Sequence, residues 1–411
     1  MGSAAEIVIV GGGIAGMALA SALARDGRDV AVLEASIEYE DKVRGEEMAP
    51  WGVAEALELG VQQALVDSDA RVTAEVVHYD SLLPTEVSLA HPIPANIVVP
   101  GVRGLLNLRH PEACTALAKQ AIDDGAQVHR GVTDVTVVPG ATPTITAQGT
   151  TGEALEFRPR LVVGADGRSS TVRRQSAIAL ERHDATHMIA GVLVDGLDDP
   201  EIEHDWLATS DDLFMASFRQ HHGQVRVYLV PGTQQKARFA GRDGLAEFMR
   251  SVNFACLPFG ERLANANPIG PLATYAGDDT WTDKPYTDGV VLIGDAAGYN
   301  SPIIGQGLSI AMRDARSVRD AIRSGDRLPD AFRPYAAERT ERMRRLRTGA
   351  IFMSAVAADD CDNRTARRAK FFELQQAEPL TMAMLVSWFA GPETAPPEAF
   401  DGRLLAAVLA A

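Results

Sequence analysis

The sequence predicts an α/β protein in two parts, and three features indicate this fold class. Residues 6–34 follow the order strand, glycine loop, helix, strand, which is typical of a parallel βαβ unit. Residues 181–275 contain short alternating apolar and polar runs between turn residues, which predicts a separate sheet. At residues 293–307 a second glycine-rich loop, IGDAAGYNSPIIGQG, follows another apolar strand. The length of 411 residues also exceeds the size at which one core stops growing.

The composition is that of a folded globular protein, with 46% hydrophobic and 23% charged residues. The 39 basic and 55 acidic residues give a formal charge of −16, so we expect neither nucleic acid nor an anionic membrane as a partner. The longest apolar runs, such as residues 381–390, reach about half of the ~20 residues of a membrane span. Three scattered cysteines without a CxxC pair suit a reducing compartment, so we expect a cytoplasmic protein without a metal site.

The first glycine loop carries the clearest chemical signal. Gly11, Gly13 and Gly16 form GxGxxG between the strand ending at Val10 and a helical run, and Glu34 ends the next strand. The glycines permit a tight turn and close approach to a pyrophosphate at the helix N-terminus, and the acidic residue accepts a hydrogen bond from a ribose hydroxyl. The motif therefore predicts a dinucleotide site, although the loop alone does not separate FAD from NAD.

The rest of the chain continues this pattern of helices and strands. Residues 53–65 have helical spacing, residues 74–90 suggest a hairpin, and residues 111–126 form a helix with proline at its start and glycine at its stop. Strands are then predicted in VHRGVTDVTVV, PTITAQG, ALEFRPRLVVGADG, THMIAGVLVDG, LFMASFRQ and QVRVYLVPG. From about Leu308 to the end the chain is predicted to be mostly helical.

A third motif, LVVGADGRSSTVRR at residues 161–174, places a small-residue turn after a strand. By itself it would be an ordinary turn. Together with GGGIAG and GDAAGYNSPIIGQG, in this order and spacing, it resembles the single-component (class A) FAD-dependent monooxygenases of the para-hydroxybenzoate hydroxylase fold over residues 5–345.

This resemblance implies a discontinuous, Rossmann-like FAD-binding domain of the GR2 type, made of residues 1–73, 99–180 and 276–350. A sheet-rich substrate domain, residues 74–98 and 181–275, is inserted into it. Residues 351–411 form a C-terminal helical segment whose role, like the oligomeric state, stays open.

The resemblance also implies the cofactor contacts. The pyrophosphate loop is Gly11, Gly13, Ile14, Ala15 and Gly16. Glu34 would bind the adenosine ribose, Arg44 would lie along the flavin cofactor, and Arg109 would reach its phosphates or ribityl chain. Val132 would supply backbone contacts to adenine.

The two later motifs are assigned in the same way. Asp166 and Gly167 resemble the family's DG motif, which is associated with FAD and with the transient NADH or NADPH. Asp295 would bind the ribityl chain, and Pro302, Gly305 and Gly307 would pack beside the isoalloxazine ring. Backbone amides of the last two can stabilise negative charge on a reduced flavin at a helix N-terminus.

In the resembled family NADH or NADPH reduces FAD, dioxygen adds at the flavin C4a, and the hydroperoxide hydroxylates or epoxidises a small aromatic or polyketide-like substrate. No separate catalytic side chain is therefore assigned. Substrate contacts are expected from the 181–275 sheet, where Met215 and Tyr228 are the predicted pocket residues. The chain departs from the family at GDAAH, because Gly298 and Tyr299 follow GDAA here, and this puts the substrate class in doubt.

Several alternatives stay open. One is an oxygenase fed by a separate flavin reductase, and another is a geranylgeranyl-reductase-like flavoprotein that inserts no oxygen; a non-catalytic FAD-binding module is a third. A flavin halogenase is disfavoured because the four tryptophans are remote from one another and form no WxWxIP motif. His183 and His187 have i, i+4 spacing but no carboxylate partner, so they are interpreted as solvated histidines.

Overall fold

The computed structural model describes residues 5–411 except 199–201, 326, 329 and 360. Its α/β part is built on a six-stranded sheet in the order β21-β22-β12-β1-β2-β8. The predicted α/β fold class is confirmed, and the central strands are parallel. Their bounds are β1 Ile7–Val10, β2 Val30–Glu34, β8 Gln127–Arg130, β12 Leu161–Gly164 and β22 Val290–Leu292, with β21 Tyr286–Thr287 antiparallel at the edge.

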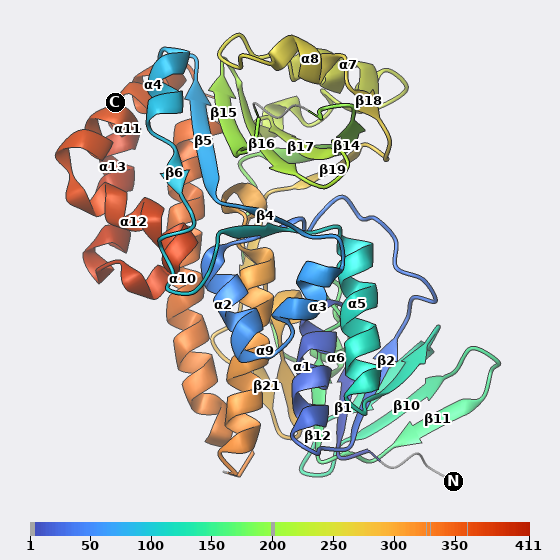
Figure 1. The fold of residues 1–411 in the computed structure, drawn as a ribbon. Coiled ribbons are helices and arrows are strands. Elements are labelled where there is room, and N and C mark those ends of the chain that lie inside the picture. Colours follow the sequence, from blue (N-terminus) through green and yellow to red (C-terminus); the bar gives the residue numbers. More distant parts are fainter. Residues whose placement is uncertain (1–4, 199–201, 326, 329, 360) are drawn as a thin grey trace.

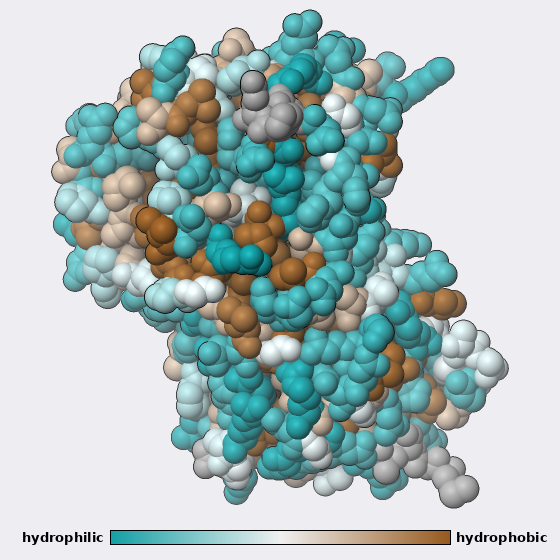
Figure 2. Space-filling view, in the orientation of Figure 1, coloured by the Kyte–Doolittle hydropathy of each residue, from teal (hydrophilic) through white to brown (hydrophobic). Residues whose placement is uncertain are grey.

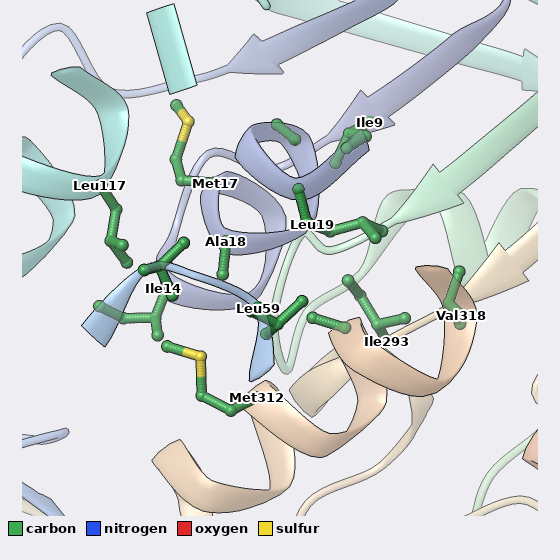
Figure 3. Packing of buried hydrophobic residues seen from close by; sticks show 14 of the residues in the cluster. Ile9, Ile14, Met17, Ala18, Leu19, Leu59, Leu117, Ile293, Met312 and Val318 are labelled. Carbon is green, nitrogen blue, oxygen red and sulfur yellow. The ribbon is translucent and has the colours of Figure 1, made fainter. Parts of the chain in front are cut away.

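Helix α1 (Ile14–Arg25) lies on one face of this sheet, between α5 (His110–Asp123) and α9 (Gly307–Arg323). Many of its residues are alanine, so neighbouring helices approach closely while Leu19 and Met17 fill the space beneath. Figure 3 shows Leu19, Met312 and Ile293 among the side chains of this core. Burying each such side chain stabilises the fold by about 1.5–3 kcal/mol.

Two three-stranded sheets adjoin the α/β part, and β13 (Glu181–His183) pairs with β20 (Asp279–Trp281) in a separate two-stranded sheet. One contains β9 (Thr133–Val138), β10 (Thr144–Gln148) and β11 (Ala154–Phe157). The other, in the order β3-β7-β4, lies between the two parts of the molecule in Figure 1. Its strands are β3 Glu47–Met48, β7 Leu105–Asn107 and β4 Arg71–Thr73.

The second part is an eight-stranded sheet in the order β18-β14-β17-β16-β15-β5-β6, with β19 paired to β14. Short helices α7 (Gly244–Ser251) and α8 (Gly260–Ala264) lie beside it at the top of Figure 1. The strands are β5 Glu75–Asp80, β6 Ile93–Pro94, β14 Met188–Asp195, β15 Asp205–Ser210, β16 Leu213–Arg219, β17 Val225–Val230, β18 Asn267–Pro268 and β19 Ala273–Ala276.

One local prediction is wrong, and another is confirmed in part. The hairpin predicted over residues 74–90 is a strand, β5, followed by helix α4 (Thr85–Ala90), because Pro84 stands at the N-cap and starts a helical turn. The helical segment predicted over residues 53–65 is helical but contains a break: it forms α2 (Pro50–Glu58) and α3 (Gln62–Asp67), since Gly60 adopts a φ of +70° between them.

The C-terminal segment is helical and packs against both parts. Helix α10 (Arg333–Ala357) runs from the α/β part to the bundle of α11 (Arg364–Ala377), α12 (Pro379–Ala390) and α13 (Arg403–Leu409), as Figure 1 shows. Within the described residues, none of the helices combines the length and apolar character that crossing a bilayer requires.

A buried ion-pair cluster ties α9 and α10 to the turn after β22. Asp314 of α9 is fully buried; it pairs with Arg339 at 2.9 Å and Arg342 at 2.6 Å, and accepts a hydrogen bond from the Gly294 amide at 2.9 Å. Arg339 also donates to the carbonyl oxygens of Ala297, at 2.9 Å, and Gly298, at 2.7 Å. Buried charged side chains therefore hold the GDAAG turn in place.

Candidate functional site

A cavity of about 960 Å³ begins at the first glycine loop and continues beneath the second sheet to the C-terminal helices. All three sequence motifs contribute to its lining, so residues that are far apart in the chain meet at one site. The predicted site residues among them are Gly11, Gly13, Ile14, Ala15, Glu34, Arg44, Val132, Asp166, Gly167, Tyr228, Asp295, Pro302, Gly305 and Gly307.

The glycines of the first loop are required for different structural reasons. A Cβ atom on Gly11, whose φ is +105°, would lie 2.3 Å from the Ala165 carbonyl oxygen, and one on Gly16 would lie 2.0 Å from the Gly11 oxygen. A Cβ on Gly13 would meet no described atom within 4 Å. Gly11 and Gly16 thus allow the loop to pack, while Gly13 leaves the space in front of α1 open.

Glu34 anchors this loop from the end of β2. One of its carboxylate oxygens accepts a hydrogen bond from the Gly12 amide at 2.5 Å, and the other accepts one from the Ser36 amide at 2.7 Å. The side chain also lines the cavity. Its charge therefore lies at the position where the GxGxxG pattern places a ribose ligand.

Replacing Glu34 with alanine should weaken FAD binding by roughly 10- to 100-fold, because a charge-assisted hydrogen bond contributes about 1.5–3 kcal/mol. The measurement is the dissociation constant of FAD from quenching of its fluorescence. Glu34→Gln, which keeps an acceptor oxygen of the same reach, serves as the control and should lose less. An alanine variant that binds FAD as tightly as the wild type would contradict the role of Glu34.

The second and third motifs are linked by Arg168. Its Nε donates to Asp295 at 3.2 Å, and its guanidinium carbon lies 4.3 Å from the centre of the Tyr299 ring. Asp166 lies beside them and caps helix α6 (Thr171–Gln175), accepting hydrogen bonds from the amides of residues 171 and 172 at 2.6 and 3.1 Å. This carboxylate orders the turn; its role toward the cofactors stays a prediction.

The loop of residues 302–307 forms another wall of the cavity. Gly305 adopts the left-handed conformation with φ +66°, while a Cβ on Gly307, the first residue of α9, would point into open space. Gln306 is buried and accepts a hydrogen bond from Trp51 Nε1 at 2.9 Å. The loop is therefore fixed by α2 and presents its backbone to the cavity.

The cavity has a basic edge, but one arginine is placed differently from the prediction. Arg44, Lys42 and His110 line it, whereas Arg109 does not and pairs instead with Glu112 at 3.2 Å. Burial, together with the charges of Arg44 and Lys42, lowers the pKa of His110 to about 4. Because Arg109 is the N-cap residue of α5, the next residue, His110, lines the cavity in its place.

The second sheet covers the cavity with one of its faces. Phe214, Ala216 and Tyr228 line the cavity, whereas Met215 is fully buried among apolar residues that include Phe248 of α7. Successive residues of a strand point to opposite faces, and Met215 is on the face away from the cavity. The prediction of Met215 as a pocket residue is therefore wrong, while Tyr228 lies in the lining.

Tyr228 belongs to a buried polar group. Its hydroxyl donates to Glu46, which also lies 3.4 Å from Arg226 Nε, and Arg226 pairs with Asp41 at 2.5 Å. Burial raises the pKa of Glu46 to about 7, although Arg226 and Tyr228 oppose this shift. The cavity wall thus contains a carboxyl group whose burial favours the protonated form.

The far end of the cavity is apolar and is lined by residues beyond 350. Phe371 of α11 and Leu385, Val386 and Phe389 of α12 contribute side chains. Phe389 also packs against the small cluster that joins β5, β6 and β7. Figure 2 shows hydrophobic residues gathered on this face, around α12 and β6.

The structure explains why position 298 is a glycine, which the sequence did not reveal. Its φ is +104°, and a Cβ atom would lie 2.5 Å from the Thr280 carbonyl oxygen and 2.7 Å from the Trp281 Cα. Strand β20 (Asp279–Trp281) approaches the turn so closely that a side chain has no room. Tyr299 then donates its hydroxyl to Asp278 at 2.8 Å.

The interpretation of His187 as a solvated histidine is wrong. It is buried, with hydrogen-bond contacts to Ser301 Oγ and Ser354 Oγ, both at 3.1 Å. Burial lowers its pKa to about 4, so the ring is neutral and links the loop before Pro302 to α10. Among the described residues no group of three or more potential ligands is arranged to hold a metal ion.

Comparison with known proteins gives the family. The model of a family described as "FAD binding domain" matches residues 4–350. The chain belongs to this FAD-binding family. The glycine cradle fits the cofactor, because Cβ positions at Gly13, Gly167 and Gly307 meet no described atom within 4 Å and α1 carries no side-chain cap at its N-terminus.

The individual relatives share only a low sequence identity with this flavoprotein. Squalene monooxygenase SE1 from Panax ginseng is 26% identical over 328 residues, which is 77% of this chain and 58% of the relative. The chain thus spans about three fifths of the length of such curated relatives. Among solved structures, p-nitrophenol 4-monooxygenase from Pseudomonas putida has a TM-score of 0.78 at 17% identity, covering 98% of this chain and 100% of that one.

A flavoprotein/dehydrogenase from Cytophaga hutchinsonii superimposes with a TM-score of 0.79 at 14% identity, covering 99% of this chain and 98% of that one. These likenesses show that the chain shares the fold of these two flavoproteins. A dehydrogenase and a monooxygenase share this fold, so the reaction must be argued from the site.

Sequence reasoning missed several lining residues of this FAD-binding chain. No role was predicted for Glu46 and Glu47, and Arg109 was predicted at the place where His110 lines the cavity. Adjacent acidic residues between two predicted elements were a usable signal, since a carboxyl group next to a cofactor motif is a candidate site residue. The apolar contribution of α11 and α12 had no motif that could predict it.

Proposed function

We propose that the chain is an FAD-dependent monooxygenase that uses NADH or NADPH and dioxygen to hydroxylate or epoxidise an apolar organic substrate, aromatic or polyketide-like in character. The observation that carries this proposal is the single cavity that joins the FAD motifs to an apolar chamber. The squalene monooxygenases among its relatives support oxygenation of an apolar molecule.

In this proposal residues at one end of the cavity bind FAD. The amides at the start of α1 meet the pyrophosphate, Glu34 meets the ribose, and Asp295, oriented by Arg168, meets the ribityl chain. The residue 302–307 loop lies beside the ring. When bound, FAD supplies the redox chemistry, accepting hydride from the nicotinamide cofactor and activating dioxygen.

The remaining residues hold the substrate and exclude water. Phe214 and Ala216 of the sheet and Phe371 and Leu385 of the C-terminal helices all line this cavity and belong to one hydrophobic cluster. An apolar chamber favours an apolar substrate and lowers the local dielectric, which strengthens electrostatic effects at the reacting atoms. The Glu46–Tyr228 pair provides polar groups in the cavity wall that contact one oxygen or hydroxyl group of that substrate.

The test uses the FAD-loaded full-length chain with NADH or NADPH and a panel of aromatic, polyketide-like and polyprenyl compounds, squalene included. Nicotinamide oxidation, oxygen consumption and product mass are followed together. The proposal expects one compound to accelerate both consumptions and to give a product heavier by one oxygen atom.

The alternatives give different results in the same experiment. Product formed only when a separate flavin reductase supplies reduced FAD would indicate a two-component oxygenase. Nicotinamide oxidation that reduces an alkene without oxygen consumption would indicate a reductase of the geranylgeranyl type. Absence of product under all these conditions, with FAD bound, would contradict the proposed activity.

A further inference from the structure

Glu47 places a carboxyl group directly against the loop of residues 302–307. It lies in β3, paired with Asn107 of β7, and its side chain lines the cavity. A Cβ atom added to Gly305 would lie 2.3 Å from Glu47 Oε2. The Glu47 carboxyl group therefore lies directly beside the Gly305 backbone, while the φ of +66° favours glycine at this position.

Within the described part of the chain, no hydrogen-bond donor is found for the Glu47 carboxyl group. Asp205, whose charge acts on Glu47, has different surroundings. Asp205 of β15 accepts hydrogen bonds from the Arg219 amide and from Asn107 Nδ2, both at 2.7 Å. A carboxyl group with donors retains the negative charge, and one without donors retains the proton. The geometry therefore places a negative charge on Asp205 and leaves the proton on Glu47.

The surrounding charges agree with this assignment. Burial, and then the charge of Asp205, raise the pKa of Glu47 well above its usual range. Burial raises the pKa of Asp205 only to about 6, because its two donors and the charges of Arg71 and Arg219 oppose the shift. The preceding residue, Glu46, is directed to Tyr228 and Arg226 and belongs to a separate group.

We propose that Glu47 is a neutral carboxylic acid that donates a hydrogen bond to the flavin ring bound beside Gly305. The proposal depends on FAD binding, which the family membership supports, and does not depend on oxygen transfer to any substrate. A neutral donor stabilises the electron density that a flavin gains on reduction, whereas an ionised carboxylate at the same place repels it. Glu47 thereby tunes the reduction potential of the cofactor.

The test is the midpoint potential of bound FAD, measured against reference dyes from neutral to alkaline pH without substrate. In the wild type the potential should fall by an additional step as Glu47 loses its proton at alkaline pH. The step should equal at least a tenfold change in the ratio of affinities for reduced and oxidised FAD, which is about 30 mV for a two-electron couple.

Glu47→Gln keeps a neutral donor and should match the wild type at neutral pH while lacking the alkaline step. Glu47→Leu removes the donor and should show the lowered potential already at neutral pH. Glu38→Gln, an exposed position in the same segment, is the control and should reproduce the wild-type profile. An alkaline step that persists in Glu47→Gln would overturn the proposal.

Two further measurements do not depend on substitutions at Glu47. Asp205→Asn removes the neighbouring charge, so the alkaline step should move to lower pH; a step that stays in place would overturn the assignment. The infrared spectrum of the wild-type holoprotein at neutral pH should contain a protonated carboxyl band that changes on flavin reduction. Absence of such a band would likewise contradict a neutral Glu47.

Discussion

Replacing Asp314 with alanine should lower the free energy of unfolding by about 3–5 kcal/mol, because it leaves the buried guanidinium group of Arg339 without a counter-charge and that of Arg342 with Glu338 alone. Arg339 and Arg342 are 1% and 3% exposed, so water does not replace the lost carboxylate. The amide of Gly294 loses its acceptor in the same substitution. The variant should therefore both unfold at lower denaturant concentration and bind FAD more weakly.

Chemical denaturation and FAD titration measure these two effects. Asp320→Ala is a matched control on the same helix, because Asp320 also pairs with arginine side chains but is 41% exposed at its side chain. It should lose less than about 1 kcal/mol. Equal stabilities of the two variants would show that the buried cluster does not support the turn after β22.

Gly298→His, which restores the residue found in many members of the resembled family, should destabilise the protein by about 3–5 kcal/mol instead of improving it. A histidine must adopt the φ of +104°, and its Cβ must also displace the backbone of residues 280 and 281. Strain at such a φ contributes about 1–3 kcal/mol, and overpacking contributes a similar amount.

The control is Gly391→His. Gly391 has a φ of +108° and a ψ of +136°, close to the +104° and +147° of Gly298, and a Cβ there would meet only the flexible carboxylate end of Glu393, at 2.9 Å, so the conformational strain is matched without a backbone collision. The difference between the two variants in thermal unfolding isolates the collision with β20. If both variants lose the same stability, the close approach of β20 is not what excludes the histidine.

The central fold could be predicted because its signals are local. The GxGxxG loop, the strand before it and Glu34 after it specify a βαβ unit by spacing alone, and the structure has β1, α1 and β2 in these places. The prediction of a hairpin over residues 74–90 failed because short alternating runs of apolar and polar residues do not distinguish a strand from a short helix that follows Pro84.

The site was less predictable, for a different reason. Residues 213–219 are apolar on both faces of their strand, and Met215 and Phe214 are each fully buried. Periodicity tells which residues share a face but not which face meets the cavity. Contacts such as that of Glu47 with Gly305 join segments far apart in the chain, so they appear only when the backbone is placed.

The sheet order β22-β12-β1 has a consequence for how the newly made chain folds on the ribosome. Strand β1 is synthesised early. Strand β22, which pairs with β12 in the same sheet, and helix α9, which packs on α1, come nearly three hundred residues later. At about 5–20 residues per second, this interval lasts roughly 15–60 s. During that time α5 can cover one side of α1, but the side that packs on α9 has no native cover and stays exposed on the nascent chain until α9 emerges.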